Sequence, residues 1–290
     1  MKNFKDFLKK TLDKKTYNKL LILYHTFKSS YDNPLLEFIR KIINLFRPKY
    51  PSLFFFSLPK SASESICYEL MDILNFNRKL ISAHEYFLYD IFSRHLIRKI
   101  NSKGDMICEH IPFNEFNKKC IEHYKVFNKF VINIRDPRNA IISFAFFCKE
   151  IIKQDLFKKE FAEFMNPQLD EAIVDMNDFQ LIDYFIKNYY IHFVDWINNW
   201  TKYAENKNNI LILKYEDYVD NPKTYIQNIL NFKSYPKNLV DKHKFKKKIH
   251  ANKIKSFKTD YKLQMTKEQI LYVDKIGEMI LKKFYKITYE

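Results

Sequence analysis

A cation and three serines gather in the short stretch PKSASES at residues 59–65. The stretch directly follows an unbroken apolar run, which predicts a buried strand, and it opens an apparent helix. Backbone N–H groups at such a strand-to-helix turn bind anions, and the hydroxyls of Ser61, Ser63 and Ser65 can add donors. Lys60 can place a positive charge against a phosphate. A helix capped by Ser61 or Ser63, with Lys60 in solvent, is the plainer interpretation of the same residues.

A second strand-to-helix junction carries charge at residues 130–143, which read FVINIRDPRNAIIS. Together the two stretches resemble the sulfotransferases that use 3′-phosphoadenosine 5′-phosphosulfate (PAPS). That family has a PKSGTTW-type loop after its first strand and an R-[DN]-P-x-[DN]-x-x-x-S junction, to which PKSASES and RDPRNAIIS are similar. The resemblance covers roughly residues 50–286. Three further segments share it: CEHIPF at 108–113, YYIHFVDWINNW at 189–200 and LILKYEDYVDNP at 211–222.

The resemblance implies transfer of a sulfuryl group from PAPS to a hydroxyl or amine of an acceptor, with PAP (3′,5′-ADP) as product and no metal ion. Sulfuryl transfer is an in-line displacement comparable to phosphoryl transfer. By the family match, Lys60 stabilises the charge that builds on the bridging oxygen in the transition state. The residues expected to hold the phosphosulfate through amides or hydroxyls are Lys60, Ser61, Ala62, Ser63, Glu64 and Ser65.

Two residues of the second stretch match the family's ligands of the 3′-phosphate. Arg135 ends a strand, whereas Ser143 lies two turns along the following helix and is expected to face back toward it. A guanidinium and a hydroxyl suit a terminal phosphate. Tyr215 matches a family tyrosine that lines the nucleotide pocket, although a buried core tyrosine explains this residue nearly as well.

His110 occupies the position where the family carries its general base. An imidazole near its ordinary pKa can accept the proton of an acceptor hydroxyl at neutral pH. A loop histidine bonded to a backbone carbonyl is the alternative. Glu109 is the adjacent second candidate, because carbohydrate sulfotransferases can use a carboxylate as base.

The first loop departs from the family pattern at three positions. The chain has only two glycines and neither lies here, so a Walker A ATPase or GTPase is disfavoured, and the family's glycine is Ala62. Alanine is a mild replacement provided that its φ stays negative. Ser65 replaces an aromatic residue that can stack on adenine. Glu64 replaces a hydroxyl residue, so its carboxylate must point away from the phosphates.

The C-terminal segment is a weaker match. Residues 252–269, NKIKSFKTDYKLQMTKEQ, lack the arginine and both glycines of the family's R-K-G-x-x-G-D-W segment. Lys253 and Lys255 can still cover the 3′-phosphate as point charges. Two solvated lysines in a Lys-rich segment are an equal alternative.

Short apolar runs alternate with helical patterns from residue 53 onward. This order predicts an α/β, P-loop-like three-layer fold with a central, mostly parallel sheet flanked by helices. The expected strands are 53–58, 79–82, 106–109, 130–134 and 210–213. The expected helices are about 63–75, 85–100, 138–150, 178–205, 222–232 and 266–284, the last with a capping box at Thr266 and Gln269.

Residues 1–48 are expected to form a separate, basic amphipathic helical extension, followed by the sulfotransferase-like domain at 49–290. Apolar residues such as Leu20, Leu21 and Tyr24 share one helical face, and Asn33-Pro34 predicts the start of a second helix. Packing on the protein's own core is favoured for this stripe. Peripheral contact with a membrane surface is the alternative.

The net charge of +16 favours anionic partners, although a Lys-rich solvated surface explains much of it. The four cysteines are widely spaced. Their spacing fits neither a zinc site nor a disulfide framework. No signal peptide or membrane-spanning run is seen at the charged N-terminus or beyond. We therefore expect a cytoplasmic protein, with membrane association on the cytoplasmic side left open.

Two rival functions remain open at this stage. A catalytically inactive PAPS- or PAP-binding protein of the same fold would also explain the degraded motifs. A nucleic-acid-binding module is disfavoured, because the basic residues are dispersed and no recognition fold is evident.

Residues 84–105 and 150–178 are where folds of the sulfotransferase type usually shape the acceptor site. Carbohydrate, lipid-linked glycan and small alcohol all stay open as acceptors, and the oligomeric state is not predicted.

Overall fold

The structure, a computed structural model, describes residues 50–82, 91–153, 169–241, 243, 245, 260–285 and 287. All of them belong to the compact unit Lys49–Glu290. The helical extension expected at residues 1–48 lies outside the described residues.

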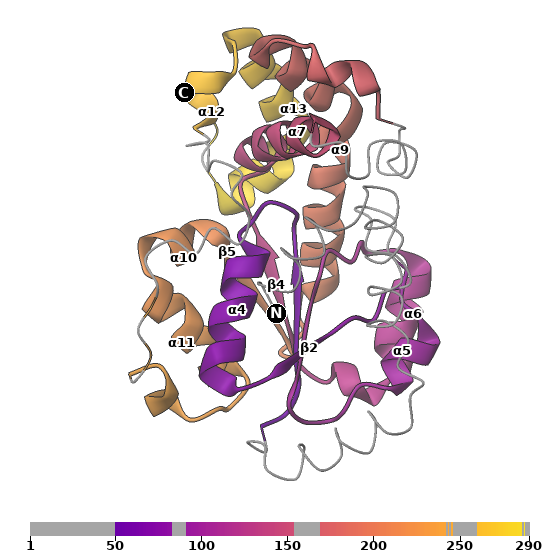
Figure 1. Cartoon of the computed structure of the whole chain (residues 1–290), viewed down its shortest axis with the longest axis vertical. Coiled ribbons are helices and arrows are strands. Elements are labelled where there is room, and N and C mark those ends of the chain that lie inside the picture. The colour runs from indigo at the N-terminus through magenta and orange to yellow at the C-terminus, as the bar shows by residue number, and fades with distance from the viewer. Residues whose placement is uncertain are drawn as a thin grey trace, which may run out of the picture. The chain divides into compact units, whose positions relative to one another are not determined.

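A fully parallel sheet forms the centre of this unit (Figure 1), in the order β2-β3-β1-β4-β5. Its central strands are continuous apolar runs because helices cover both faces of the sheet. Since β1 lies between β3 and β4, the carboxyl ends of these three strands meet at one edge. The strands are β1 (Leu53–Ser57), β2 (Asn77–Lys79), β3 (Asp105–Glu109), β4 (Phe130–Ile134) and β5 (Ile210–Lys214).

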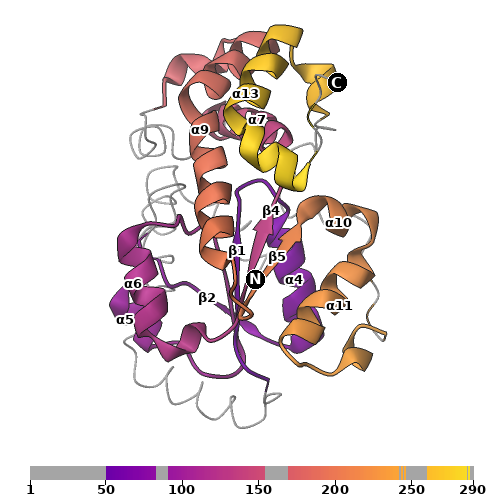
Figure 2. The same ribbon diagram turned by 180° about the vertical axis from the view of Figure 1, so that it is seen from behind.

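Helices α4 (Ser63–Leu74), α10 (Tyr215–Asp220) and α11 (Pro222–Phe232) lie on one side of the sheet (Figures 1 and 2). Alternate residues of a strand point to opposite faces. Leu53 and Phe55 of β1 accordingly pack in one hydrophobic cluster with Leu70 of α4 and Ile226 of α11. This cluster fixes α4, and with it the loop that precedes α4, against the sheet.

The other side carries α5 (Arg94–Arg98), α6 (Glu115–His123) and the C-terminal part of the long α9 (Asp178–Ala204). Phe54 and Phe56 of β1 pack here, and the ring of Phe56 stacks on Trp200 of α9 at 5.5 Å. Trp196 and Trp200 both donate their indole N–H to the carbonyl of Ile111, each at 2.9 Å. These two bonds fasten the segment that follows β3.

Beyond the carboxyl edge, α7 (Pro137–Lys153), α12 (Tyr261–Gln264) and α13 (Lys267–Phe284) pack with the N-terminal part of α9 (Figure 1). The predicted capping box at Thr266 and Gln269 is confirmed at the start of α13. Gly277 of α13 allows close packing, because a Cβ there would lie 2.9 Å from the hydroxyl of Tyr190. Within the described ranges, three short 3₁₀ helices are also present: Lys125–Phe127, Glu171–Val174 and Lys237–Leu239.

The structure corrects two of the predicted elements. The second strand is Asn77–Lys79 rather than 79–82, and within the described part of 85–100 only Arg94–Arg98 is helical. The helix Glu115–His123 was not predicted. Within the described residues, no helix is both long and apolar enough to cross a membrane. All four cysteines are buried free thiols.

Candidate active site

The loop between β1 and α4 has an unusual backbone. Lys60 and Ala62 both have positive φ, at 64° and 55°. Helix α4 begins directly after Ala62, and no side chain caps its first turn. The interpretation of this segment as a helix capped by Ser61 or Ser63 is therefore wrong. The N-terminus of α4 lies at the carboxyl edge of the sheet, where helix amides can bind an anion.

The condition under which alanine would be a mild replacement, a negative φ at Ala62, is not met. Its φ of 55° and ψ of 27° lie in the left-handed region, where an L-residue is strained. The loop thus needs a left-handed backbone at this position, which the family's glycine adopts easily and which alanine adopts here. The helix itself supports the conformation, because the amide of Ile66 donates to the carbonyl of Ala62 at 3.0 Å.

Ala62→Gly is expected to stabilise the protein. The left-handed conformation costs an L-residue roughly 1–2 kcal/mol, and the extra chain entropy of glycine returns about 0.5–1 kcal/mol. The free energy of unfolding should therefore rise by about 0.5–1 kcal/mol in a urea titration. Ala145→Gly, inside α7, is the control and should lower the free energy of unfolding by about 1 kcal/mol. A loss in both variants would contradict the strain at Ala62.

A buried polar network holds this loop from beneath. Asn133 of β4 donates from Nδ2 to the Ser61 carbonyl at 2.9 Å and to the Ser61 hydroxyl at 3.1 Å. The Ser61 hydroxyl also contacts Ser57 Oγ at 2.6 Å and donates to the carbonyl of Leu58. Tyr225 of α11 donates to Asn133 Oδ1 at 2.9 Å, which fixes the orientation of the amide.

This network corrects the expected role of the Ser61 hydroxyl. The side chain of Ser61 is completely buried and its hydroxyl is engaged below the loop, so it is not a ligand donor. Ser61 can still offer its backbone amide. A polar network satisfied in this way defines a single loop conformation, because leaving any member unpaired in the interior would cost stability.

The ammonium group of Lys60 is desolvated and rests 4.1 Å from the centre of the Phe147 ring. Burial, together with the charge of Arg135, lowers the pKa of Lys60 to about 8. Among the residues that the structure describes, no carboxylate forms an ion pair with it. A desolvated cation without a carboxylate partner is stabilised by an incoming anion, which is what a phosphosulfate site requires.

Arg135 lies at the end of β4, directly against this loop. One of its terminal N–H groups donates to the carbonyl of Lys60, and its guanidinium lies 4.5 Å from the centre of the Tyr215 ring. Tyr215 therefore supports Arg135 rather than filling the hydrophobic core. Ser143 is half-buried on α7, in the helix that follows Arg135. The structure thus brings the two predicted motifs to the same edge of the sheet.

An ion-pair cluster, not singled out in the sequence, makes the second motif rigid. Arg138 binds Asp136 at 2.7 Å and Asp274 of α13 at 2.8 Å, and all three side chains are buried. Its guanidinium also lies 4.1 Å from the centre of the Tyr261 ring. Glu216 accepts the backbone N–H of Asp136 at 3.0 Å. Arg138 can be recognised in the sequence as a charged residue of RDPRN. Its partner Asp274 is 136 residues away in the chain, so the sequence does not reveal the ion pair.

The remaining residues of the first motif are also placed. Glu64 forms a double hydrogen bond with Arg78 of β2, at 2.6 and 2.8 Å, so its carboxylate is engaged with a cation. Ser63 is buried at the first position of α4, and Ser65 is half-buried one residue beyond Glu64. Lys253 and Lys255 lie outside the described residues, so their expected contact with the 3′-phosphate stays a prediction.

His110 follows β3, and its protonation state can be assigned from one contact. Its Nδ1 lies 2.7 Å from the Ser57 carbonyl, which only accepts, so Nδ1 carries the hydrogen. Nε2 then keeps a lone pair. Burial lowers the pKa of His110, and the charge of Lys60 acts in the same direction. The ring is therefore neutral at pH 7 and able to accept a proton.

Glu109 serves a different purpose from the one considered for it. Its two carboxylate oxygens accept the backbone N–H groups of Ile81 at 2.5 Å and Ser82 at 3.0 Å. Burial raises its pKa to about 7. Both oxygens hold the chain after β2, so the geometry favours His110 over Glu109 as the base.

These observations define an α/β protein with a cationic, anion-accepting loop at the carboxyl edge of a parallel sheet. The sulfotransferase domain family matches residues 94–286. The chain belongs to this family. The match begins after the loop at 59–65, whose sequence departs from the family pattern. No protein with a curated description matches the chain.

Among the solved structures that share the fold are two that contain PAP. Mouse sulfotransferase SULT7A1 complexed with PAP aligns over 81% of this chain and 86% of its own, with 14% identity and a TM-score of 0.51. Retinol dehydratase in complex with androsterone and inactive cofactor PAP aligns over 84% of each chain, with 14% identity and a TM-score of 0.50. At such identities the likeness extends to the fold.

Proposed function

We propose that the chain moves the sulfuryl group of PAPS to a hydroxyl or amine of an acceptor and releases PAP. The observation that carries this proposal is the pair of desolvated cations, half-buried Lys60 and buried Arg135, which meet at the carboxyl edge of the sheet. They come from the two motifs that resemble the family's ligands for the two ends of the nucleotide. The residues fit a polyanion, because the loop offers uncapped amides and a cation without a carboxylate partner among the described residues.

Each residue has a distinct task in this proposal. PAPS supplies an activated sulfuryl group, which leaves by in-line displacement. The amides that open α4 bind its phosphosulfate, and Lys60 neutralises the charge that develops on the bridging oxygen. Arg135, backed by the ring of Tyr215, binds the 3′-phosphate together with Ser143.

His110 accepts the acceptor's proton at Nε2. The bond from Nδ1 to the Ser57 carbonyl orients the ring and fixes the tautomer, as a positioning contact does in other acid–base sites. Ser57 is also the last residue of β1, and the loop that carries Lys60 leaves from it. The base and the cation are therefore held by the same short stretch of backbone.

The acceptor is proposed to be a glycan or lipid-linked glycan on the cytoplasmic side of a membrane. The support for this is the basic, amphipathic sequence at residues 1–48, which suits an anionic surface. A hydroxyl acceptor of another class would use the same catalytic residues. A sulfate-transfer assay with labelled PAPS over mixed acceptors distinguishes these classes, and it also separates an active enzyme from an inactive nucleotide-binding protein.

Arg135→Ala is expected to weaken binding of 3′,5′-ADP by about 10- to 100-fold, because hydrogen bonds to charged groups contribute about 1.5–3 kcal/mol. Calorimetric titration measures the affinity. Lys202→Ala, an exposed residue of α9, is the matched control and should leave it unchanged. Equal affinities of wild type and Arg135→Ala, with intact folding, would refute the assignment of the 3′-phosphate site.

A further inference from the structure

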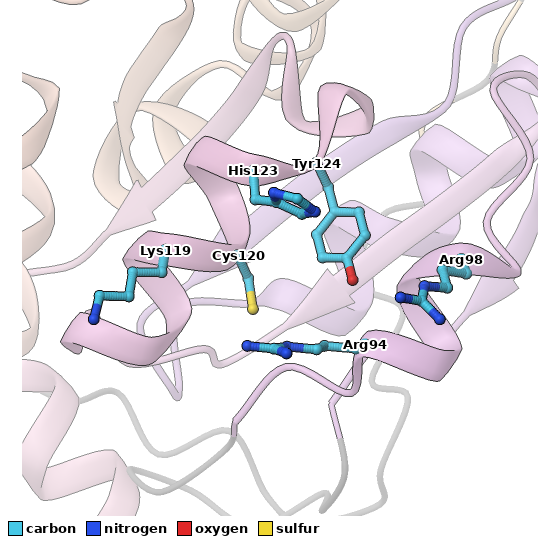
Figure 3. A pocket seen from close by; sticks show the side chains of 6 residues that line it. All are labelled: Arg94, Arg98, Lys119, Cys120, His123 and Tyr124. Carbon is cyan, nitrogen blue, oxygen red and sulfur yellow. The ribbon is translucent and has the colours of Figure 1, made fainter.

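A second basic site lies away from the loop and the sheet edge described above. A pocket of about 320 Å³ lies between α5 and α6 (Figure 3). These two helices lie on the side of the sheet opposite α4 (Figure 1). Helix α6 starts after His110 and leads back toward the beginning of β4, so its last residues lie away from the carboxyl edge. The lining residues are Arg94, Arg98, Lys119, Cys120, His123 and Tyr124.

Two pairs of basic side chains converge on this pocket. Arg94 and Arg98 are four residues apart on α5, and Lys119 and His123 are four residues apart on α6. The like charges of Arg94 and Arg98 at this spacing destabilise a helix unless an anion lies between them. Within the part of the chain that the structure describes, none of these side chains forms an ion pair and no carboxylate lines the pocket.

Arginine is rare in this chain, which makes its position informative. Only seven of the 50 Lys and Arg residues are Arg. Among the described arginines, Arg78 and Arg138 are paired with carboxylates and Arg135 lies in the active site. The two others, which are exposed, both line this pocket. A guanidinium presents paired N–H donors that match the oxygens of phosphate and sulfate better than lysine does.

The rest of the pocket suits a body larger than a bare ion. Figure 3 shows the rings of His123 and Tyr124 side by side above Cys120, with the guanidinium of Arg94 below the thiol. The two rings meet edge to face at 4.8 Å. A volume of about 320 Å³ is at the lower end for small-ligand sites. It accommodates one sugar ring with an ester group.

We propose that this pocket binds a sugar-sized molecule through a phosphate or sulfate monoester, which the guanidinium groups of Arg94 and Arg98 hold. The ester can belong to a soluble sugar or to a lipid headgroup. This site is independent of the nucleotide site, and it gives the enzyme a second point of contact with an anionic ligand.

The test is calorimetric titration with glucose 6-sulfate of protein saturated with 3′,5′-ADP. Binding is expected for the wild type, with at least a tenfold loss in the double variant Arg94→Gln/Arg98→Gln. Lys267→Gln/Lys275→Gln removes the same charge from exposed positions of α13 and should bind within twofold of wild type. Unesterified glucose is the ligand control and should not bind. Thermal melting verifies that the variants fold.

Vesicles separate the two sources of the ester. Co-sedimentation with phosphatidic acid vesicles that depends on Arg94 and Arg98, and is absent with phosphatidylcholine, supports a lipid headgroup. Arginine-dependent binding of glucose 6-sulfate alone supports a soluble ester. Equal loss in the α13 variant, or no binding of either probe, overturns the proposal. Titration with 3′,5′-ADP alone reports the nucleotide site separately, so failure of one site is distinguishable from failure of the other.

Discussion

Replacing Lys60 by alanine is expected to reduce sulfuryl transfer at least about 1000-fold, or about 4 kcal/mol in the activation barrier. The affinity for 3′,5′-ADP should change by less than about threefold, since that ligand lacks the sulfuryl group whose transfer Lys60 assists. The physical reason is the desolvated ammonium group, which has no carboxylate partner among the described residues. It therefore contributes most where new negative charge develops.

Two variants define the control for this experiment. Lys60→Met keeps an unbranched side chain against Phe147 and removes only the charge, so it should lose transfer as Lys60→Ala does. Lys214→Ala removes an ammonium from the end of β5, where it lies 3.9 Å from Asp217. This variant should keep full activity. Transfer rates with labelled PAPS and calorimetric affinities for 3′,5′-ADP are the two measurements.

The backbone of Lys60 gives a reason to expect that nucleotide affinity and sulfuryl transfer respond differently to loss of its side chain. Its carbonyl accepts a hydrogen bond from Arg135, and a side-chain substitution leaves that carbonyl in place. Nucleotide affinity should therefore survive the loss of the side chain. A parallel fall in affinity and transfer would mean that Lys60 acts in binding, and the catalytic role assigned to it would be wrong.

The sequence was sufficient to predict that the two motifs meet at one edge of the sheet. In a parallel sheet the carboxyl ends of neighbouring strands meet, so PKSASES and RDPRNAIIS had to gather if their strands were neighbours. The register of β1 and β4 pairs Ser57 with Asn133, two residues before Arg135. The order of the strands in the sheet depends on long-range packing, so hydrophobic periodicity alone does not predict it. The resemblance to the sulfotransferase family supplied the expectation that the two motifs meet.

Helix α6 shows why one element escaped prediction. Its sequence, EFNKKCIEH, is mostly polar, and one of its buried positions is Asn117. That amide accepts the backbone N–H of Phe92 at 2.9 Å and donates to the carbonyl of Pro112 at 2.9 Å. A polar residue thus occupies a position where the periodic pattern calls for an apolar one, and its partners come from other segments.

The orientation of the Ser61 side chain and the backbone conformation of Ala62 could not be predicted from the sequence for a related reason. The side chain of Ser61 has the same donor and acceptor whether it faces a ligand or the interior. Its inward orientation follows from Asn133 and Ser57, which lie beneath the loop only in the folded sheet. The positive φ of Ala62 is likewise imposed by the surrounding structure, against the preference of the residue.

The pH dependence of kcat/KM is expected to be bell-shaped. His110 must be neutral to act as base, so activity is lost as pH falls through its pKa, which burial places below the ordinary value. Lys60 must be protonated, so activity is lost as pH rises through its pKa of about 8 in the free enzyme. Because kcat/KM reports the free enzyme, both limbs should be visible in initial rates at low PAPS.

His110→Asn separates the base from its positioning contact. The asparagine amide can still donate to the Ser57 carbonyl, but nothing replaces the lone pair of Nε2. We expect kcat to fall by about 10²- to 10⁴-fold, with unchanged affinity for 3′,5′-ADP. The residual activity should lose its acid limb and keep its alkaline limb, since Lys60 is untouched.

His95→Asn, at an exposed position of α5, is the matched control and should retain both limbs and full activity. If His110→Asn kept the acid limb, another group would be the base. Glu109 is then the first candidate, since burial brings its pKa to about 7. However, its two oxygens already accept the amides of Ile81 and Ser82, so proton transfer to it would require this part of the chain to move.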